Sequence, residues 1–204
     1  DCTRFPKETS WVISQLKNIK GNIVLSMGCG PNFYDDCLSF GKIPKEFTGM
    51  DINKNTIVFL KKSKNSNIKK RRKFIQSKKI KIKLIQDNLL KLRKDFVNHF
   101  DVIYATGVLC TLNKADVQKA IQLIYMYLKP NGCFVDIDWA GLCQESEYGV
   151  KDQYRFYSKQ NVSIQEINKF LKEFGFINIK RKILNVHNKK KYAWDKVYSY
   201  IAEK

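Results

Sequence analysis

Glycines and a carboxylate follow two short apolar runs near the start of the chain. The run Ile23–Leu25 is followed by Gly28 and Gly30, and a second run, Phe47–Asp51, ends in a carboxylate 21 positions after Gly30. Glycine permits a positive φ and lets a ligand approach the backbone closely. An aspartate about 20 residues beyond such glycines can accept hydrogen bonds from ribose hydroxyls. The spacing therefore predicts a nucleotide-like cofactor, although Gly-x-Gly by itself is also typical of an ordinary strand-to-helix turn.

Apolar runs that suit strands continue along the chain and alternate with helical patterns. Three further candidate strands are Ile80–Gln86, Asp101–Gly107 and Cys133–Asp138. The clearest helix is predicted over 116–128, where apolar residues recur at helical spacing, and Pro and Gly in the turn 129–132 end it. This alternation predicts an α/β fold with a parallel sheet and helices on both faces.

At these segments the chain resembles the class I S-adenosylmethionine-dependent methyltransferases, which have a Rossmann-like fold. Met27–Gly30 is similar to the first motif of that family, Phe100–Leu109 to its fourth-strand motif, and Leu128–Gly132 to the turn before its fifth strand. Two runs near the end, Ile177–Val186 and Asp195–Ile201, resemble its sixth and seventh strands. The resemblance implies a single doubly wound seven-stranded sheet, mostly parallel, with the last strand antiparallel.

The resemblance also implies the cofactor, S-adenosylmethionine, with S-adenosylhomocysteine as product. The resemblance implies that Asp51 binds the ribose hydroxyls and that Asp87 lies near the adenine amino group. It further implies that the end of the fourth strand borders the transferred methyl group. The expected cofactor-binding residues are Met27, Gly28, Cys29, Gly30, Asp51, Ile52, Asp87, Asn88, Leu89, Ala105 and Thr106.

Two positions depart from the family pattern. Ser26 stands where the family usually has an acid, and Asn32 where it has a third glycine. We expect backbone carbonyls of the turn to replace the acid, and Asn32 to tolerate a left-handed backbone. The main competing cofactor is a nicotinamide dinucleotide. Phe33 disfavours a dinucleotide, because a large ring there would keep the helix away from the strand. A pyrophosphate would then lose its close binding site at the N-terminus of the helix.

Candidate catalytic residues follow the fifth strand. Asp138 is expected to orient or deprotonate an acceptor, and Trp139 either stacks on an acceptor or simply packs. His187, in a polar turn between the last two strands, is a weaker candidate base. By resemblance, residues 1–20 form an N-terminal helical lid and residues 139–160 an acceptor-side insertion.

The 204 residues suit one methyltransferase domain, 1–204. Six cysteines without a Cys-x-x-Cys pair do not predict a zinc site, and no metal is expected. No apolar run is long enough to cross a bilayer, so a cytoplasmic location without a membrane partner is expected. Because the chain begins at Asp1 rather than methionine, we expect a trimmed chain or a piece of a longer polypeptide.

The formal net charge is +19, and the segment Lys61–Lys83 holds twelve basic residues and no acid. Such a block either contacts RNA or another polyanion or is a solvated charged face. No Asn-Pro-Pro-Tyr-like motif follows the fourth strand, which favours O- or N-methylation of a small-molecule acceptor. The alternatives are an RNA methyltransferase that uses the basic segment, and a non-catalytic methyltransferase-like binding subunit.

Overall fold

The computed structural model describes residues 17, 19, 21–40, 43–140, 162–185 and 196–204. Side chains at positions 139, 140, 184, 185, 196 and 197 lie outside this description. The expected N-terminal lid therefore lies almost entirely outside the described residues, and so does nearly all of the expected acceptor-side insertion.

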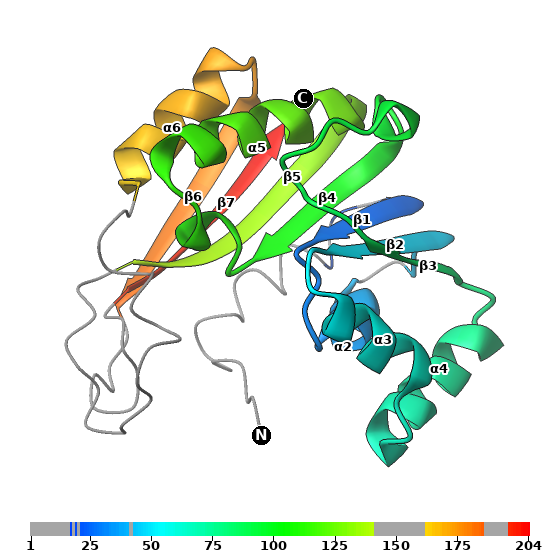
Figure 1. The fold of residues 1–204 in the computed structure, drawn as a ribbon. Helices are drawn as coiled ribbons and strands as arrows, with labels where there is room; N and C mark the ends of the chain where they lie inside the picture. Colours follow the sequence, from blue (N-terminus) through cyan, green and yellow to red (C-terminus); the bar gives the residue numbers. More distant parts are fainter. Residues whose placement is uncertain (1–16, 18, 20, 41–42, 141–161, 186–195) are drawn as a thin grey trace, which may run out of the picture.

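A seven-stranded sheet in the order β3-β2-β1-β4-β5-β7-β6 forms the centre of the structure (Figure 1). The first five strands pair in parallel, whereas β7 is antiparallel to both β5 and β6. The predicted mostly parallel sheet with an antiparallel last strand is confirmed. The strands are β1 Ile23–Met27, β2 Glu46–Asp51, β3 Lys81–Gln86, β4 Phe100–Thr106, β5 Leu128–Ala140, β6 Ile177–Asn185 and β7 Lys196–Glu203.

Helices cover both faces of this sheet, as predicted. Figure 1 shows α5 and α6 on one face and α2, α3 and α4 on the other. None of the helices in the described part of the chain is long and apolar enough to cross a membrane. The helices are α2 Phe33–Ser39, α3 Lys54–Lys62, α4 Ser66–Ser77, α5 Lys114–Tyr127 and α6 Ile164–Glu173, with short 3-10 turns η1 Lys94–Phe96 and η2 Leu109–Thr111.

Each face of the sheet has its own apolar core, because side chains alternate along a strand. In β1, Leu25 and Met27 belong to the core under α5 and α6, whereas Val24 belongs to the core under α2, α3 and α4. All three side chains are fully buried. The apolar run at the start of the chain is thus a central strand covered on both sides.

The predicted turn at 129–132 has a different structure. Helix α5 ends at Tyr127, and β5 begins at once with Leu128. The pairing with β4 then slips, so that the residues after Leu128 form a bulge before Cys133 pairs with Val102. Asn131 has a φ of 62° and donates its N–H to the carbonyl of Lys204 at 3.1 Å. The end of the chain thus incorporates the turn residues into the sheet.

Helix α2 packs on the sheet without the third glycine of the family pattern. The ring of Phe33 is fully buried and lies over β2. A Cβ added to Gly49 would come within 2.6 Å of this ring, so the missing side chain at Gly49 makes the room. The expectation for Asn32 is wrong: it occupies the N-cap position of α2 with a φ of −91°, outside the left-handed region. In the family pattern a glycine on the helix lets helix and strand approach closely. In this chain the glycine that makes the room is Gly49, on strand β2.

This packing predicts that Gly49→Ala lowers the free energy of unfolding by about 1–3 kcal/mol, because a methyl group would overpack the core. Urea denaturation measures the change. In a Phe33→Leu background the same substitution should have a smaller effect. An equal loss in both backgrounds would show that Phe33 is not the side chain Gly49 accommodates.

Candidate active site

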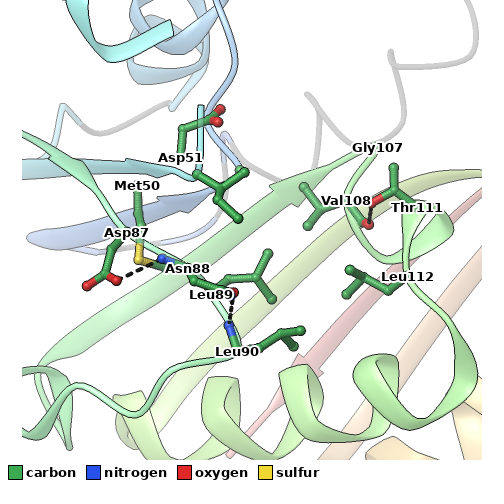
Figure 2. Close-up of a pocket in the computed structure, with 12 residues that line it drawn as sticks. Met50, Asp51, Asp87, Asn88, Leu89, Leu90, Gly107, Val108, Thr111 and Leu112 are labelled. Carbon is green, nitrogen blue, oxygen red and sulfur yellow. Dashed lines mark hydrogen bonds between the residues drawn. The ribbon is translucent and has the colours of Figure 1, made fainter. Parts of the chain in front are cut away.

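A pocket of about 330 Å³ lies at the carboxyl ends of β1, β2, β3 and β4 (Figure 2). Ligands of open α/β sheets bind at this edge of the sheet. Figure 2 shows Asp51 and Asp87 on one side of the pocket and Thr111 and Leu112 on the other. The lining residues are Gly28, Met50, Asp51, Ile52, Asp87, Asn88, Leu89, Leu90, Gly107, Val108, Thr111 and Leu112.

The turn after β1 is tied to the end of β2. Gly28 and Gly30 have φ values of 60° and 54°, as the glycine pattern predicted. The N–H of Cys29 donates to the carbonyl of Met50 at 3.0 Å, and the N–H of Gly30 donates to Oδ2 of Asp51 at 3.0 Å. Two consecutive N–H groups thereby position the glycine turn beside the carboxylate.

The Asp51 carboxylate is oriented from both sides. Its Oδ1 accepts from the N–H of Asn53 at 2.8 Å, while its Oδ2 faces Gly30. The side chain of Asn53 in turn caps α3 by accepting from the N–H of Asn55. Each carboxylate oxygen has two lone pairs, so Asp51 keeps acceptor capacity toward the pocket.

Asp87 follows β3 and carries its own counter-ion. Arg93 donates to its Oδ2 at 2.8 Å, and the N–H of Asn88 donates to Oδ1 at 2.8 Å. Burial acts to raise the pKa of Asp87, but the hydrogen bonds from Arg93 and Asn88 outweigh it and hold the pKa below its ordinary value. Asp87 is therefore charged at neutral pH.

The opposite wall is the segment 107–112, which follows β4. Gly107 has a φ of 65°, and its N–H donates to the carbonyl of Ile137 at 2.8 Å. Val108 packs against the glycine turn so closely that a Cβ on Gly28 would lie 2.6 Å from its Cγ2. Glycine at position 28 is therefore required by its neighbour as well as by its backbone conformation.

Comparison with known proteins identifies the family. A family model described as "Methyltransferase domain" matches residues 25–134, which is more than half of the chain. The chain belongs to this methyltransferase family. None of the curated protein sequences compared with the chain matches it.

Solved structures with the same fold support this result. An N-methyltransferase NodS from Bradyrhizobium japonicum, in complex with S-adenosylhomocysteine, matches with a TM-score of 0.66 and 15% identity over 100% of this chain and 89% of its own. A SAM-dependent methyltransferase from Archaeoglobus fulgidus has a TM-score of 0.62 and 17% identity, covering 98% and 97%. Phosphoethanolamine N-methyltransferase 2 from Haemonchus contortus has a TM-score of 0.63 and 16% identity, covering 94% of this chain and 52% of its own. At these low identities, the TM-scores show a shared fold, the class I Rossmann-like fold.

The methyltransferase pocket contains six of the residues expected from sequence. They are Gly28, Asp51, Ile52, Asp87, Asn88 and Leu89. The other expected cofactor residues lie next to the lining. Met27 and Ala105 point into the core under α5 and α6, and Cys29 points into the opposite core. Gly30 reaches the pocket through its bond to Asp51, and Thr106 immediately precedes the lining residue Gly107.

The cysteine of the glycine turn is not a nucleophile. Burial raises the pKa of the Cys29 thiol, and the charges of Asp51 and Asp36 raise it further. The thiol is therefore neutral at physiological pH and acts as a small apolar side chain.

Six lining residues were not among the expected ones. Gly107 and Val108 fall within the fourth-strand motif Phe100–Leu109, and Met50 falls within the predicted run Phe47–Asp51, so these segments were the available signal for them. Leu90, Thr111 and Leu112 follow strands β3 and β4 in chain reversals that periodicity does not reveal. The six are Met50, Leu90, Gly107, Val108, Thr111 and Leu112.

Of the expected catalytic residues, the structure describes the side chain of Asp138 alone, and Asp138 does not line this pocket. Asp138 is fully buried, and its Oδ2 accepts from the N–H of Cys110 at 3.0 Å. Position 139 lies in β5, but the side chain of Trp139 is outside the described residues, and so is His187. A general base must come within hydrogen-bond reach of the acceptor, so the burial of Asp138 does not support that role.

The ion pair at the pocket edge predicts a pH effect. With its folded pKa below the unfolded value of about 3.9, Asp87 stabilises the fold above that pH, and this contribution is lost as the pH falls through the folded pKa. Arg93→Met should raise the pKa of Asp87 and shrink this acid-dependent loss. Carboxyl NMR titration, with urea unfolding at pH 7 and 3, measures both effects.

Asp95 provides the control for this substitution, because Arg93 also binds Asp95 at 2.8 Å. Asp95→Asn removes only that outer partner, so the pKa of Asp87 should remain low. If Asp95→Asn raised the pKa of Asp87 as much as Arg93→Met, the direct pairing would not be its cause.

Proposed function

We propose that the chain binds S-adenosylmethionine in this pocket and transfers its methyl group to an O or N atom of a small-molecule acceptor. The observation that carries the proposal is the meeting of Gly28, Asp51 and Asp87 around one pocket, although they lie at the carboxyl ends of three different strands. In this proposal residues 1–204 form one cytoplasmic methyltransferase domain, with 1–20 as a lid and 139–160 beside the acceptor.

The residues of the pocket fit this cofactor. Asp51 has free acceptor positions for ribose hydroxyls, and Ile52, 68% exposed, offers an apolar face to the adenine ring together with Leu89. Asp87 retains lone pairs for the adenine amino group beside Arg93. Within the described part of the chain, a Cβ on Gly30 would meet nothing closer than the carbonyl oxygen of Gly28 at 4.0 Å.

The bound cofactor would supply an electrophilic methyl group on its sulfonium. The chain's own contribution is alignment, because an in-line attack by a lone pair depends mainly on the orientation of the two reactants. Gly28 and the wall 107–112 would orient the methionine part of the cofactor, while Asp51 orients the ribose. Trp139 and His187 remain candidates for contact with the acceptor.

A small-molecule acceptor is favoured by two observations. The chain has no Asn-Pro-Pro-Tyr-like motif after β4. One of its structural neighbours is named for a small acceptor, phosphoethanolamine, and another is an N-methyltransferase. Both neighbours share the fold over nearly the whole of this chain.

Removal of the Asp51 carboxylate tests the cofactor site. Asp51→Ala should weaken binding of S-adenosylmethionine and S-adenosylhomocysteine by roughly 1.5–3 kcal/mol, the loss typical of hydrogen bonds to a charged group. Isothermal titration calorimetry measures the affinity. Asp116→Ala is the matched control, since it removes an aspartate on α5 that does not line the pocket and should leave the affinity unchanged.

The two failures of this experiment have different meanings. Unchanged affinity in Asp51→Ala would remove the ribose role of Asp51. No binding by the folded wild type would overturn the proposed enzyme and leave the non-catalytic binding subunit as the better hypothesis.

The surface of α4 favours RNA as a second candidate acceptor. Lys69, Lys70 and Lys73 are exposed on the side of α4 opposite its buried residues. The two arginines of this helix are used within the structure: Arg71 pairs with Asp35 at 2.6 Å, and Arg72 donates to the carbonyls of Lys61 and Ser63. The lysines thus form a basic face available to phosphates.

An exposed aromatic side chain accompanies the lysines. Phe74 is 47% exposed, and Nζ of Lys78 lies 5.3 Å from the centre of its ring. Aromatic side chains beside lysines are typical of surfaces that bind single-stranded nucleic acid. This combination distinguishes α4 from a uniformly charged helix.

Replacement of Lys69, Lys70 and Lys73 by Gln tests the RNA candidate. The triple variant should bind a single-stranded RNA oligonucleotide more weakly, with a salt dependence reduced by about 2 in log–log slope. Fluorescence anisotropy at several salt concentrations measures it. The control replaces the exposed Lys119, Lys172 and Lys180, on α5, α6 and β6, which removes equal charge elsewhere. An equal loss of RNA affinity in both triple variants would show that the loss comes from net charge and not from the surface of α4.

A further inference from the structure

Two carboxyl groups are buried side by side on β5, behind the pocket. Asp136 and Asp138 are both fully buried, and two positions apart on a strand they share one face. They lie opposite Tyr200 and Tyr198 of β7. Among the described residues, neither oxygen of Asp136 has a hydrogen-bond partner, and Oδ1 of Asp138 has none. Buried polar groups are normally hydrogen-bonded, so this pair needs an explanation.

Asp138 is the member of the pair that holds another part of the chain. Its Oδ2 accepts from the N–H of Cys110 at 3.0 Å, in a fully buried position. The side chain of Cys110 and, to a smaller extent, the N–H groups of Val108 and Gly107 also favour the charged carboxylate. A carboxylate at this place thus binds the backbone where the chain leaves β4.

The segment bound by Asp138 forms one wall of the pocket. Gly107, Val108, Thr111 and Leu112 line the pocket, and Cys110 lies between them. Val108 presses on the glycine turn, where it excludes any side chain at Gly28. Two contacts thus link Asp138 to the glycine turn: its hydrogen bond to the segment 107–112 and the packing of Val108 against Gly28.

We propose that Asp138 is a positioning residue, whose carboxylate holds the segment 107–112 against the glycine turn and whose protonation weakens cofactor binding. Protonation removes the negative charge that the N–H of Cys110 points at, so the wall loses this anchor. The N–H of Gly107 still binds the carbonyl of Ile137 on β5. The inference rests on the proposed function, because the occupant of the pocket is taken to be S-adenosylmethionine or its product.

Among the titratable groups around Asp138 that are compared below, Asp138 is the one expected to titrate near neutral pH. Burial raises the pKa of Asp138 to about 7, against the opposing effect of hydrogen bonds from the Cys110 side chain and from the backbone N–H groups. Burial and the charge of Asp138 raise the pKa of Asp136 well above its ordinary value, so Asp136 stays protonated. Burial also raises the pKa of Tyr198 and the pKa of Tyr200. For Tyr200, the positive charge of Arg181 acts against this rise. Cys110 is buried as well.

The direction in which cofactor affinity changes with pH distinguishes a positioning role of Asp138 from a purely structural one. A carboxyl whose folded pKa exceeds its unfolded value binds more protons in the folded state, so the stability of the fold decreases between about pH 4 and 7. Cofactor affinity should change in the opposite direction, because the charged form holds the wall. A merely structural Asp138 would make affinity follow stability.

Calorimetric titration with S-adenosylhomocysteine from pH 6 to pH 8 tests the inference. The wild type should bind roughly tenfold more tightly at pH 8 than at pH 6, since one proton is linked to binding. Asp138→Asn should bind weakly at both values, with little pH dependence. Asp136→Asn is the matched control, an isosteric change at an equally buried site on the same strand, and it should keep the wild-type profile.

The outcomes are distinct. A wild-type pH profile retained in Asp138→Asn, or a profile flattened equally by Asp136→Asn, would overturn the inference. If Asp138→Asn does not fold, the wild-type amide proton of Cys110 gives the answer by NMR, because it should titrate together with Asp138. A Cys110 amide that does not respond between pH 6 and 8 would overturn the inference. Absence of binding at every pH with a titrating Cys110 amide would instead reject the proposed function.

Discussion

The close contact between the turns after β1 and β4 is the constraint on which the site depends. Val108 occupies the space where any side chain at Gly28 would project, at 2.6 Å from a Cβ there. On the other side, the N–H groups of Cys29 and Gly30 bind the end of β2. The glycine turn is thus held between its two neighbouring strands, and this arrangement places the pocket at the carboxyl ends of β1 to β4.

The two faces of the sheet support this edge differently. Under α2, Phe33 fills the space left by Gly49, which brings the helix onto the strand without a third glycine. Under α5 and α6, the core is continuous from Met27 to Tyr200 but contains the buried carboxyls of β5. The apolar face fixes the distance between helix and strand, whereas the carboxylate fixes the chain that leaves β4.

Charge is distributed to match these tasks. The acids at the pocket edge are oriented by backbone N–H groups or by Arg93, so their carboxylates point in defined directions. The basic residues gather on α4, on the helical face that Figure 1 shows opposite α5 and α6. Lysines on that helix therefore have no part in the pocket, and any polyanion they bind would lie at a distance from the transferred methyl group.

The sequence by itself determined the order of strands and helices, the glycine turn and the acids after β2 and β3, because short apolar runs, glycines and their spacing are local properties. Tertiary structure alone decided that the Pro-Asn-Gly turn becomes a bulge paired with Lys204, since that partner is more than 70 residues away. It also decided that Asp138 is buried and binds Cys110, 28 positions earlier in the chain. The contacts between a strand end and a loop from another part of the chain depend on packing between distant segments. No local sequence pattern carries that information.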